Sequence, residues 1–104
     1  MSTEYILVYN TTPDEKTAKQ IAYALIEKKL SACVNMLSSM KSIYLWEDEV
    51  KEKVEFAILI KAVAKNYKMI EKTILKIHPY KCPSIIALPI VDGYEPFLQW
   101  IKQK

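Results

Sequence analysis

The chain has 104 residues, of which 51% are hydrophobic and 26% are charged, and its formal net charge is +3. This length suits a single domain, residues 1–104, and the apolar half of the composition excludes a disordered segment. All fifteen basic residues are lysines spread along the sequence, which argues against a nucleic-acid-binding patch. No apolar run approaches the roughly 20 residues that span a bilayer, and Met1–Tyr5 does not resemble a signal peptide. We therefore expect a cytoplasmic protein with neither nucleic-acid nor membrane partners.

A strand and a helix open the chain. Tyr5–Tyr9 is a β-branched and aromatic run that is typical of a buried strand. Thr12, Pro13 and Glu15 then have the spacing of an N-cap, a first-turn proline and a capping box. The helix that they begin is amphipathic and fades near Lys29. Its apolar stripe predicts a sheet on one side of it.

A long hairpin follows. The patterns of Ala32–Trp46 and Val50–Val63 indicate strands, and Glu47–Glu49 between them suits a turn. Strands of ~13–15 residues reach on the order of 45 Å, whereas a domain of this size has a radius of gyration of only ~13 Å. The hairpin tip should therefore project beyond the core. Because the apolar run Tyr44–Trp46 lies close to the tip and needs cover, we expect a homo-oligomer that forms through these strands.

Three further elements complete the chain. Tyr67–Ile77 is predicted to be a second amphipathic helix, and Ser84–Val91 a fourth strand in which Pro89 indicates an edge or a bulge. Tyr94–Ile101 is predicted to be a short C-terminal helix. Its predicted docking side chains are Phe97, Leu98 and Trp100. The resulting order, β-α-β-β-α-β with a helical tail, is that of an α+β, ferredoxin-like sandwich.

The segment Ile77–Pro83 is the strongest candidate for side-chain chemistry. It contains the only histidine, His78, and one of the two cysteines, Cys82, at a point where Pro79 ends a helix. A metal or a small ligand would be expected here, although a histidine at a helix end also serves as a cap. Two cysteines and one histidine are too few for a structural zinc site, so both cysteines are expected to be free thiols.

Six different short motifs follow one another in order along most of the chain. They are Thr12-Pro13-Asp14, Ala32-Cys33-Val34-Asn35, Ser42-x-Tyr44-x-Trp46, Glu55 with Ile60-Lys61, His78-Pro79-Tyr80-x-x-Pro83 and Leu98-x-Trp100-Ile101. Because it contains these six motifs in this order, the chain resembles the CutA divalent-cation tolerance family. The resemblance implies a homotrimer, related in architecture to PII signalling proteins, whose long hairpins pair across subunits. It also implies a role in tolerance of copper and other divalent cations, and no enzymatic activity.

The resemblance assigns metal ligands as well. Family members with a proposed copper site have a cysteine before the Thr-x-Pro-Asp segment and two histidines before Pro-Tyr. Asn10 and Ile77 hold two of those positions here, and only His78 matches. With His78 and Cys33 as the remaining candidates, binding of Cu(II) or another divalent cation is expected to be weak or indirect, and no cofactor is obligatory. The alternative for Cys33 is a small buried hydrophobe.

The resemblance also places Tyr44, Glu55, Lys61 and Tyr80 along a cleft between subunits. For Glu55 and Lys61 the alternative is that both side chains face solvent. A second function follows from the cleft, namely a PII-like binding module that takes a small anionic ligand through Lys61. An enzyme is the least supported class, because an acylphosphatase-type site needs an arginine and the chain has none.

Overall fold

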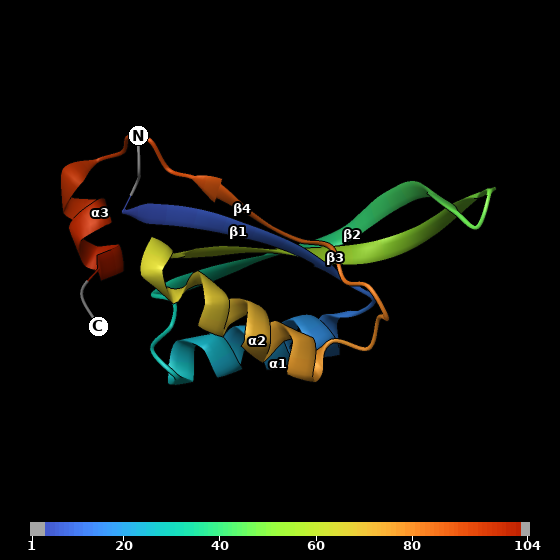
Figure 1. Ribbon diagram of the computed structural model, residues 1–104, viewed down its shortest axis with the longest axis horizontal. Coiled ribbons are helices and arrows are strands. Elements are labelled where there is room, and N and C mark those ends of the chain that lie inside the picture. The colour runs from blue at the N-terminus through green and yellow to red at the C-terminus, as the bar shows by residue number, and fades with distance from the viewer. Residues whose placement is uncertain (1–3, 103–104) are drawn as a thin grey trace.

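Four strands and three α-helices make up the fold in the computed structural model, which describes residues 4–102 (Figure 1). The elements are β1 (Tyr5–Thr12), α1 (Glu15–Glu27), β2 (Cys33–Trp46), β3 (Glu49–Val63), α2 (Tyr67–Ile77), β4 (Ile85–Pro89) and α3 (Glu95–Lys102), with a short 3-10 turn, Ala64–Asn66, before α2. The predicted order of elements is confirmed. The expectation for Met1–Tyr5 falls partly on residues 1–3, which lie outside the described residues.

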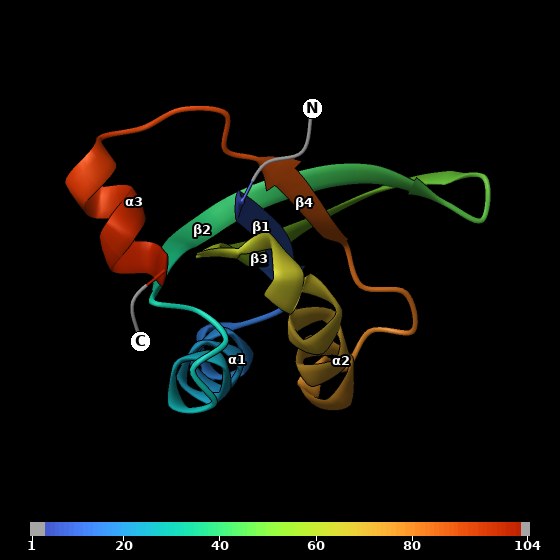
Figure 2. The ribbon, with the colours of Figure 1, turned by 60° about the vertical axis from the view of Figure 1, so that its left-hand side comes forward.

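The strands form one antiparallel sheet in the order β2-β3-β1-β4. Helices α1 and α2 lie side by side against one face of this sheet, and α3 stands at its end (Figure 2). The core between helices and sheet consists of buried aliphatic residues: Ile6, Val8, Ala18, Ile21, Leu25, Ile58, Ile60, Ala62, Ile70 and Ile74. No helix within residues 4–102 combines the length and the apolar character needed to cross a membrane.

The start of α1 differs from the predicted one. Thr12 remains in β1, where its single hydroxyl hydrogen is shared between the backbone carbonyl oxygens of Asp14, at 3.1 Å, and Phe56, at 3.3 Å. The N-cap is Asp14, whose Oδ1 accepts the Thr17 backbone N–H at 2.8 Å. Because pairing with β3 continues as far as Thr12, the hydroxyl is occupied by the strand and the next side chain able to cap takes over.

The docking of α3 also differs from the prediction. Leu98 and Ile101 are buried against Tyr5 and Val63, whereas Phe97 and Trp100 remain about half exposed. Leu98 and Ile101 are three residues apart and so share one helix face. The rings of Phe97 and Trp100 instead stack on each other, with centroids 5.7 Å apart. Of the three predicted docking residues, only Leu98 is buried, although the Phe97 ring also lies 5.5 Å from the Lys61 ammonium of β3.

Strand β4 is shorter than the predicted Ser84–Val91, and it ends at Pro89. It pairs only with β1, so it is an edge strand, as the proline indicated.

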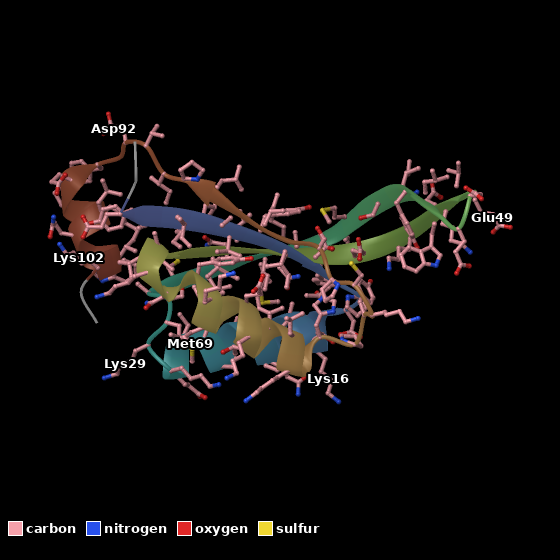
Figure 3. All side chains as sticks on the ribbon, viewed as in Figure 1. Lys16, Lys29, Glu49, Met69, Asp92 and Lys102 are labelled. Carbon is pink, nitrogen blue, oxygen red and sulfur yellow. The ribbon has the colours of Figure 1, made fainter. Side chains whose placement is uncertain are left out.

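The hairpin of β2 and β3 projects well past the helices, as predicted (Figure 1). The described residues extend 44 Å along the longest axis, and Glu49 at the hairpin tip lies at the opposite end from Lys102 (Figure 3). The loop is shorter than the predicted Glu47–Glu49, because Glu49 already pairs with Trp46. Only Glu47 and Asp48 form it, and both have positive φ, as a type I′ turn requires.

Helix α1 ends in a left-handed residue that is not glycine. The backbone N–H of Leu30 donates to the Leu25 carbonyl, and that of Lys29 donates to the Ile26 carbonyl. Lys29 itself has a φ of 60°. These bonds define a Schellman motif, whose left-handed position glycine occupies without steric cost.

We therefore predict that Lys29→Gly raises the free energy of unfolding by about 1 kcal/mol, because it relieves the contact between Cβ and the backbone at positive φ. Denaturant unfolding at pH 7 measures this. Lys28→Gly is the matched control, since Lys28 has a φ of −82°. There the added backbone freedom should cost roughly 0.5–1 kcal/mol. Equal effects at the two positions would contradict the prediction.

Candidate functional site

An irregularity in β2 decides which side chains reach the sheet face opposite the helices. Leu37 lies opposite Ala57, but Met40 lies opposite Glu55, so β2 contains one extra residue between these pairs. Ser39, within this bulge, has a φ of 55°. Because side chains alternate along a strand, the extra residue exchanges the faces of all later residues of β2. Ser42, Tyr44 and Trp46 therefore share a face with Glu55.

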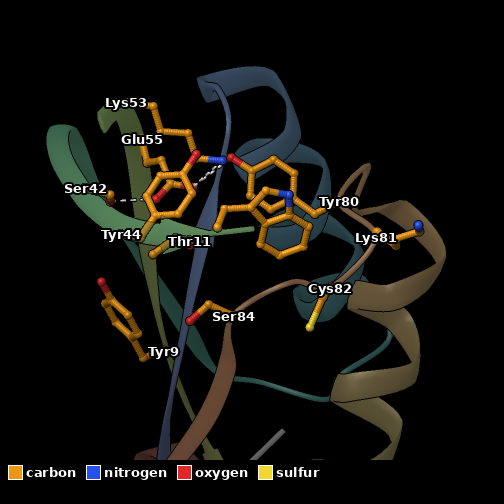
Figure 4. A pocket seen from close by; sticks show the side chains of 11 residues that line it. Tyr9, Thr11, Ser42, Tyr44, Lys53, Glu55, Tyr80, Lys81, Cys82 and Ser84 are labelled. Carbon is orange, nitrogen blue, oxygen red and sulfur yellow. Dashed lines mark hydrogen bonds and ion pairs between the residues drawn. The ribbon is translucent and has the colours of Figure 1, made fainter. Parts of the chain in front are cut away.

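These side chains form one wall of a pocket with a volume of about 560 Å³ (Figure 4). The strand β1 and the segment after α2 supply the remaining walls. Eleven residues line it: Tyr9, Thr11, Ser42, Tyr44, Trp46, Lys53, Glu55, Tyr80, Lys81, Cys82 and Ser84. Three of the four residues assigned to the cleft, Tyr44, Glu55 and Tyr80, are thus brought together.

Glu55 is the most deeply buried charge of the pocket, with 4% of its surface exposed. Its Oε1 accepts the Ser42 hydroxyl at 2.6 Å, its Oε2 accepts the Tyr80 hydroxyl at 2.7 Å, and the Lys53 ammonium lies 3.6 Å from Oε2. Burial alone would raise the pKa of the Glu55 carboxyl, but these two hydrogen bonds and the lysine hold the pKa below its usual value. The carboxylate is therefore ionised and paired, and the alternative of a solvent-facing Glu55 is wrong.

Lys53 sits between two aromatic rings as well as beside Glu55. Its Nζ is 3.9 Å from the centroid of the Tyr80 ring and 5.2 Å from that of the Tyr44 ring. Burial acts to lower the pKa of Lys53, yet Tyr80 and Glu55 raise it above its ordinary value. Burial, together with Glu55, also raises the pKa of the Tyr80 hydroxyl. The cluster thus keeps a charged lysine, a charged carboxylate and a neutral phenol together at neutral pH.

His78 uses both of its ring nitrogens within the chain. Nε2 lies 2.7 Å from the Thr11 carbonyl oxygen, and Nδ1 lies 3.2 Å from the backbone nitrogen of Tyr80. A carbonyl can only accept and a backbone N–H can only donate, so Nε2 carries the proton and Nδ1 does not. The residue as a whole is 8% exposed. A metal ion at His78 would have to replace one of these two hydrogen bonds.

Cys33 and Lys61 lie in another part of the molecule. The Lys61 ammonium is 4.0 Å from the Cys33 sulfur, and the two residues lie opposite each other in the pairing of β2 with β3. Lys61 lies across from Leu7, four residues before Thr11, a separation of about 13 Å along the strand. The structure therefore brings neither Cys33 to His78 nor Lys61 to the pocket.

The donor set for copper is incomplete. Within residues 4–102 no three histidine, cysteine, aspartate or glutamate side chains are close enough together to hold a metal ion. Asn10 is fully buried and donates to the Ser84 carbonyl at 2.9 Å, while its Oδ1 has no hydrogen-bond partner among the described residues. A single amide oxygen is a poor ligand for copper. The described residues thus provide no ready copper site within one chain.

Lys53 is not among the residues that the sequence pattern and the family resemblance indicated for the site. It is two residues from Glu55 and therefore on the same face of β3, which was a usable signal. Lys61, six residues from Glu55, was chosen instead.

Comparisons with known proteins agree with one another. The model of the family described as CutA1 divalent ion tolerance protein matches residues 6–104. The chain is 38% identical over 100 residues to the divalent-cation tolerance protein CutA of Thermus thermophilus, which covers 96% of this chain and 95% of that protein. It is 40% identical over 93 residues to human protein CutA, covering 89% of this chain and 52% of the human protein, so it spans about half the length of that relative.

Solved structures show the same fold. The crystal structure of CutA1 from the psychrotrophic bacterium Shewanella sp. SIB1 superposes with a TM-score of 0.95 and 40% identity, over 98% of this chain and 95% of that one.

The hydrogen bond between Tyr80 and Glu55 yields a pH-dependent prediction. Tyr80→Phe removes one bond to a buried charge and should lower the free energy of unfolding at pH 7 by roughly 1.5–3 kcal/mol. Because the folded-state pKa of Glu55 is depressed below 4.5, the stabilisation by this bond is present above about pH 4.5 and is lost as the pH falls through the folded value. The difference between wild type and variant should therefore shrink on acidification, as urea unfolding from pH 7 to pH 3 would show.

Tyr67→Phe is the control, because the Tyr67 hydroxyl donates to Glu71 at 3.0 Å within α2, where both residues are partly exposed and Glu71 is far less buried than Glu55. Its cost should stay below about 0.5 kcal/mol. A Tyr80→Phe effect that is no larger than this, or that is constant with pH, would contradict the role assigned to Glu55.

Proposed function

The chain belongs to the CutA1 divalent ion tolerance family, and on this basis we propose that it contributes to divalent-cation tolerance, with copper as the first ion to test. Family membership carries the proposal, supported by the match to residues 6–104 and by the relatives' names. We also propose a cytoplasmic location, a ferredoxin-like architecture and no enzymatic activity. A carboxylate that already accepts two hydrogen bonds and pairs with a lysine, as Glu55 does, suits a structural role better than proton transfer.

In this proposal the protein either binds metal ions weakly or contributes to tolerance without binding them directly. His78 and Cys33 are the proposed ligands, but His78 is engaged by Thr11 and Tyr80, and Cys33 lies beside Lys61. Releasing one hydrogen bond of a buried ring costs about 1 kcal/mol or more. Copper binding at His78 would be weakened by that amount.

Loss of the gene should increase the sensitivity of growth to copper, and wild-type protein should restore it. Calorimetric titration of the purified protein with Cu(II) should show a dissociation constant above about 10 µM, since one imidazole is a weak site and its hydrogen bonds compete.

His78→Ala separates the direct from the indirect role. We expect this variant to restore growth as well as wild type does, provided that circular dichroism shows it folded. Unchanged growth after loss of the gene across several divalent metals would contradict the tolerance role. Submicromolar 1:1 binding that disappears in His78→Ala would contradict weak or indirect binding.

The active form, in this proposal, is a PII-like homotrimer. Large apolar side chains are exposed along the hairpin and on the sheet face opposite the helices: Leu37, Ile43, Leu45, Val50, Val54, Ile86 and Leu88. Strand β2, which has fourteen residues, pairs only with β3 and leaves its other side open to another chain. Both features support assembly through the hairpin.

Light scattering at micromolar concentration should therefore give three times the 12.1 kDa mass of one chain. The double variant Ile43→Lys/Leu45→Lys should dissociate at higher concentration than wild type, because both side chains are 67% exposed and charge there opposes burial. Tyr23→Lys, at a 65% exposed position on α1, is the matched control and should remain trimeric. A wild-type mass of 12.1 kDa would refute the assembly.

A second function is favoured by the pocket itself. Its volume of about 560 Å³ falls within the range of small-molecule sites, and it combines aromatic walls with ionised side chains. We propose as the alternative that the protein is a PII-like binding module, with the pocket of Tyr44, Glu55 and Tyr80 as its ligand site. Lys53, rather than Lys61, supplies the cation nearest to these residues.

A further inference from the structure

The hydrogen-bonding capacity left over in the pocket limits what it can bind. Glu55 is the one acidic residue among the eleven that line the pocket, and both of its oxygens are already engaged by Ser42, Tyr80 and Lys53. A carboxylate has about four acceptor positions. Here one hydroxyl bonds each oxygen, the Lys53 ammonium lies beside Oε2, and Glu55 is only 4% exposed. An entering ligand therefore finds little acceptor capacity at Glu55.

Donors, in contrast, remain available. The ammonium of Lys81 and the indole N–H of Trp46 have no hydrogen-bond partner among residues 4–102, and neither group can accept a hydrogen bond. The side chain of Lys53 is 36% exposed, so its ammonium can be approached from the open pocket as well as from Glu55. Two cations and a donor-only ring favour a ligand that carries a negative charge.

Aromatic surface is the other property of the lining. The rings of Tyr44 and Tyr80 both lie within about 5 Å of the Lys53 Nζ, and Trp46 is 45% exposed. Figure 4 shows the two tyrosine rings turned toward the Lys53 end of the pocket. Flat apolar walls of this kind stack against a planar ring.

We propose that the pocket binds a small aromatic anion, with its ring against Tyr44, Trp46 and Tyr80 and its charged group beside Lys81 and Lys53. The inference rests on the second function proposed above and specifies its class of ligand. Lysine ammonium groups act as point charges, so affinity depends on charge and falls with salt.

Four probes of similar size test this, namely benzoate, benzyl alcohol, benzylammonium and cyclohexanecarboxylate. Emission of Trp46 reports binding when Trp100→Phe has removed the other tryptophan. Benzoate should bind about 5-fold more tightly than benzyl alcohol, which is the effect of roughly one surface ion pair. It should also bind more tightly than cyclohexanecarboxylate, because stacking on the aromatic side chains requires a flat ring. Benzylammonium should bind weakest.

The variant Lys81→Ala tests whether the charged group of the ligand lies beside Lys81. Lys81 is exposed, so the variant should fold normally, lose about 5-fold in benzoate affinity and keep its affinity for benzyl alcohol. Lys76→Ala, an exposed lysine on α2, is the control and should change neither affinity.

Each contrary result has a distinct meaning. Tightest binding of benzylammonium would overturn the inference in favour of a cation cage of Tyr44, Tyr80 and Glu55. Equal binding of benzoate and benzyl alcohol, or no effect of Lys81→Ala, would reject the anion while leaving a ligand pocket. No response to any probe at about 10 mM, a concentration that detects even millimolar affinities, would reject the ligand-binding function itself, and the tolerance role would stand on the growth test alone.

Discussion

Burial of the Glu55 carboxylate is the constraint on which the arrangement of side chains on the sheet face opposite the helices depends. A charge that is 4% exposed is tolerated only when it is paired and hydrogen-bonded. Its partners come from three parts of the chain, because Ser42 lies on β2, Lys53 on β3 and Tyr80 on the segment after α2. Satisfying this one group therefore fixes the hairpin against that segment. The pocket is the space that this arrangement leaves.

His78 contributes to the same arrangement through hydrogen bonds to the backbone of Thr11 and Tyr80. Its Nε2–H holds the Thr11 carbonyl, and its Nδ1 accepts the backbone N–H of Tyr80. The residue that the sequence marked as the prime metal ligand thus positions the tyrosine that serves Glu55. A family role in divalent-cation tolerance is compatible with this, provided that the metal acts at low affinity or through another molecule.

Local patterns predicted the elements well but not their details. Hydrophobic periodicity placed α2 at Tyr67–Ile77 without error, since an amphipathic helix needs only its own spacing to be recognised. The N-cap is Asp14 and not the predicted Thr12, because Thr12 is engaged in the pairing of β1 with β3. The buried face of α3 was misjudged because the largest rings, Phe97 and Trp100, were taken for the anchors. Which helix face meets the sheet depends on where the connecting segment places the helix.

The sequence by itself determined the order of elements and the length of the hairpin, whereas the grouping of Tyr44, Glu55 and Tyr80 in one site was implied by the family resemblance. Only the tertiary structure decided that Lys53 is the lysine of that site and that Ser42 and Tyr44 face it. The reason is the extra residue between Leu37 and Met40. An alternating pattern carries no mark of a bulge, whereas the pairing of β2 with β3 sets the register and with it the neighbours of every side chain.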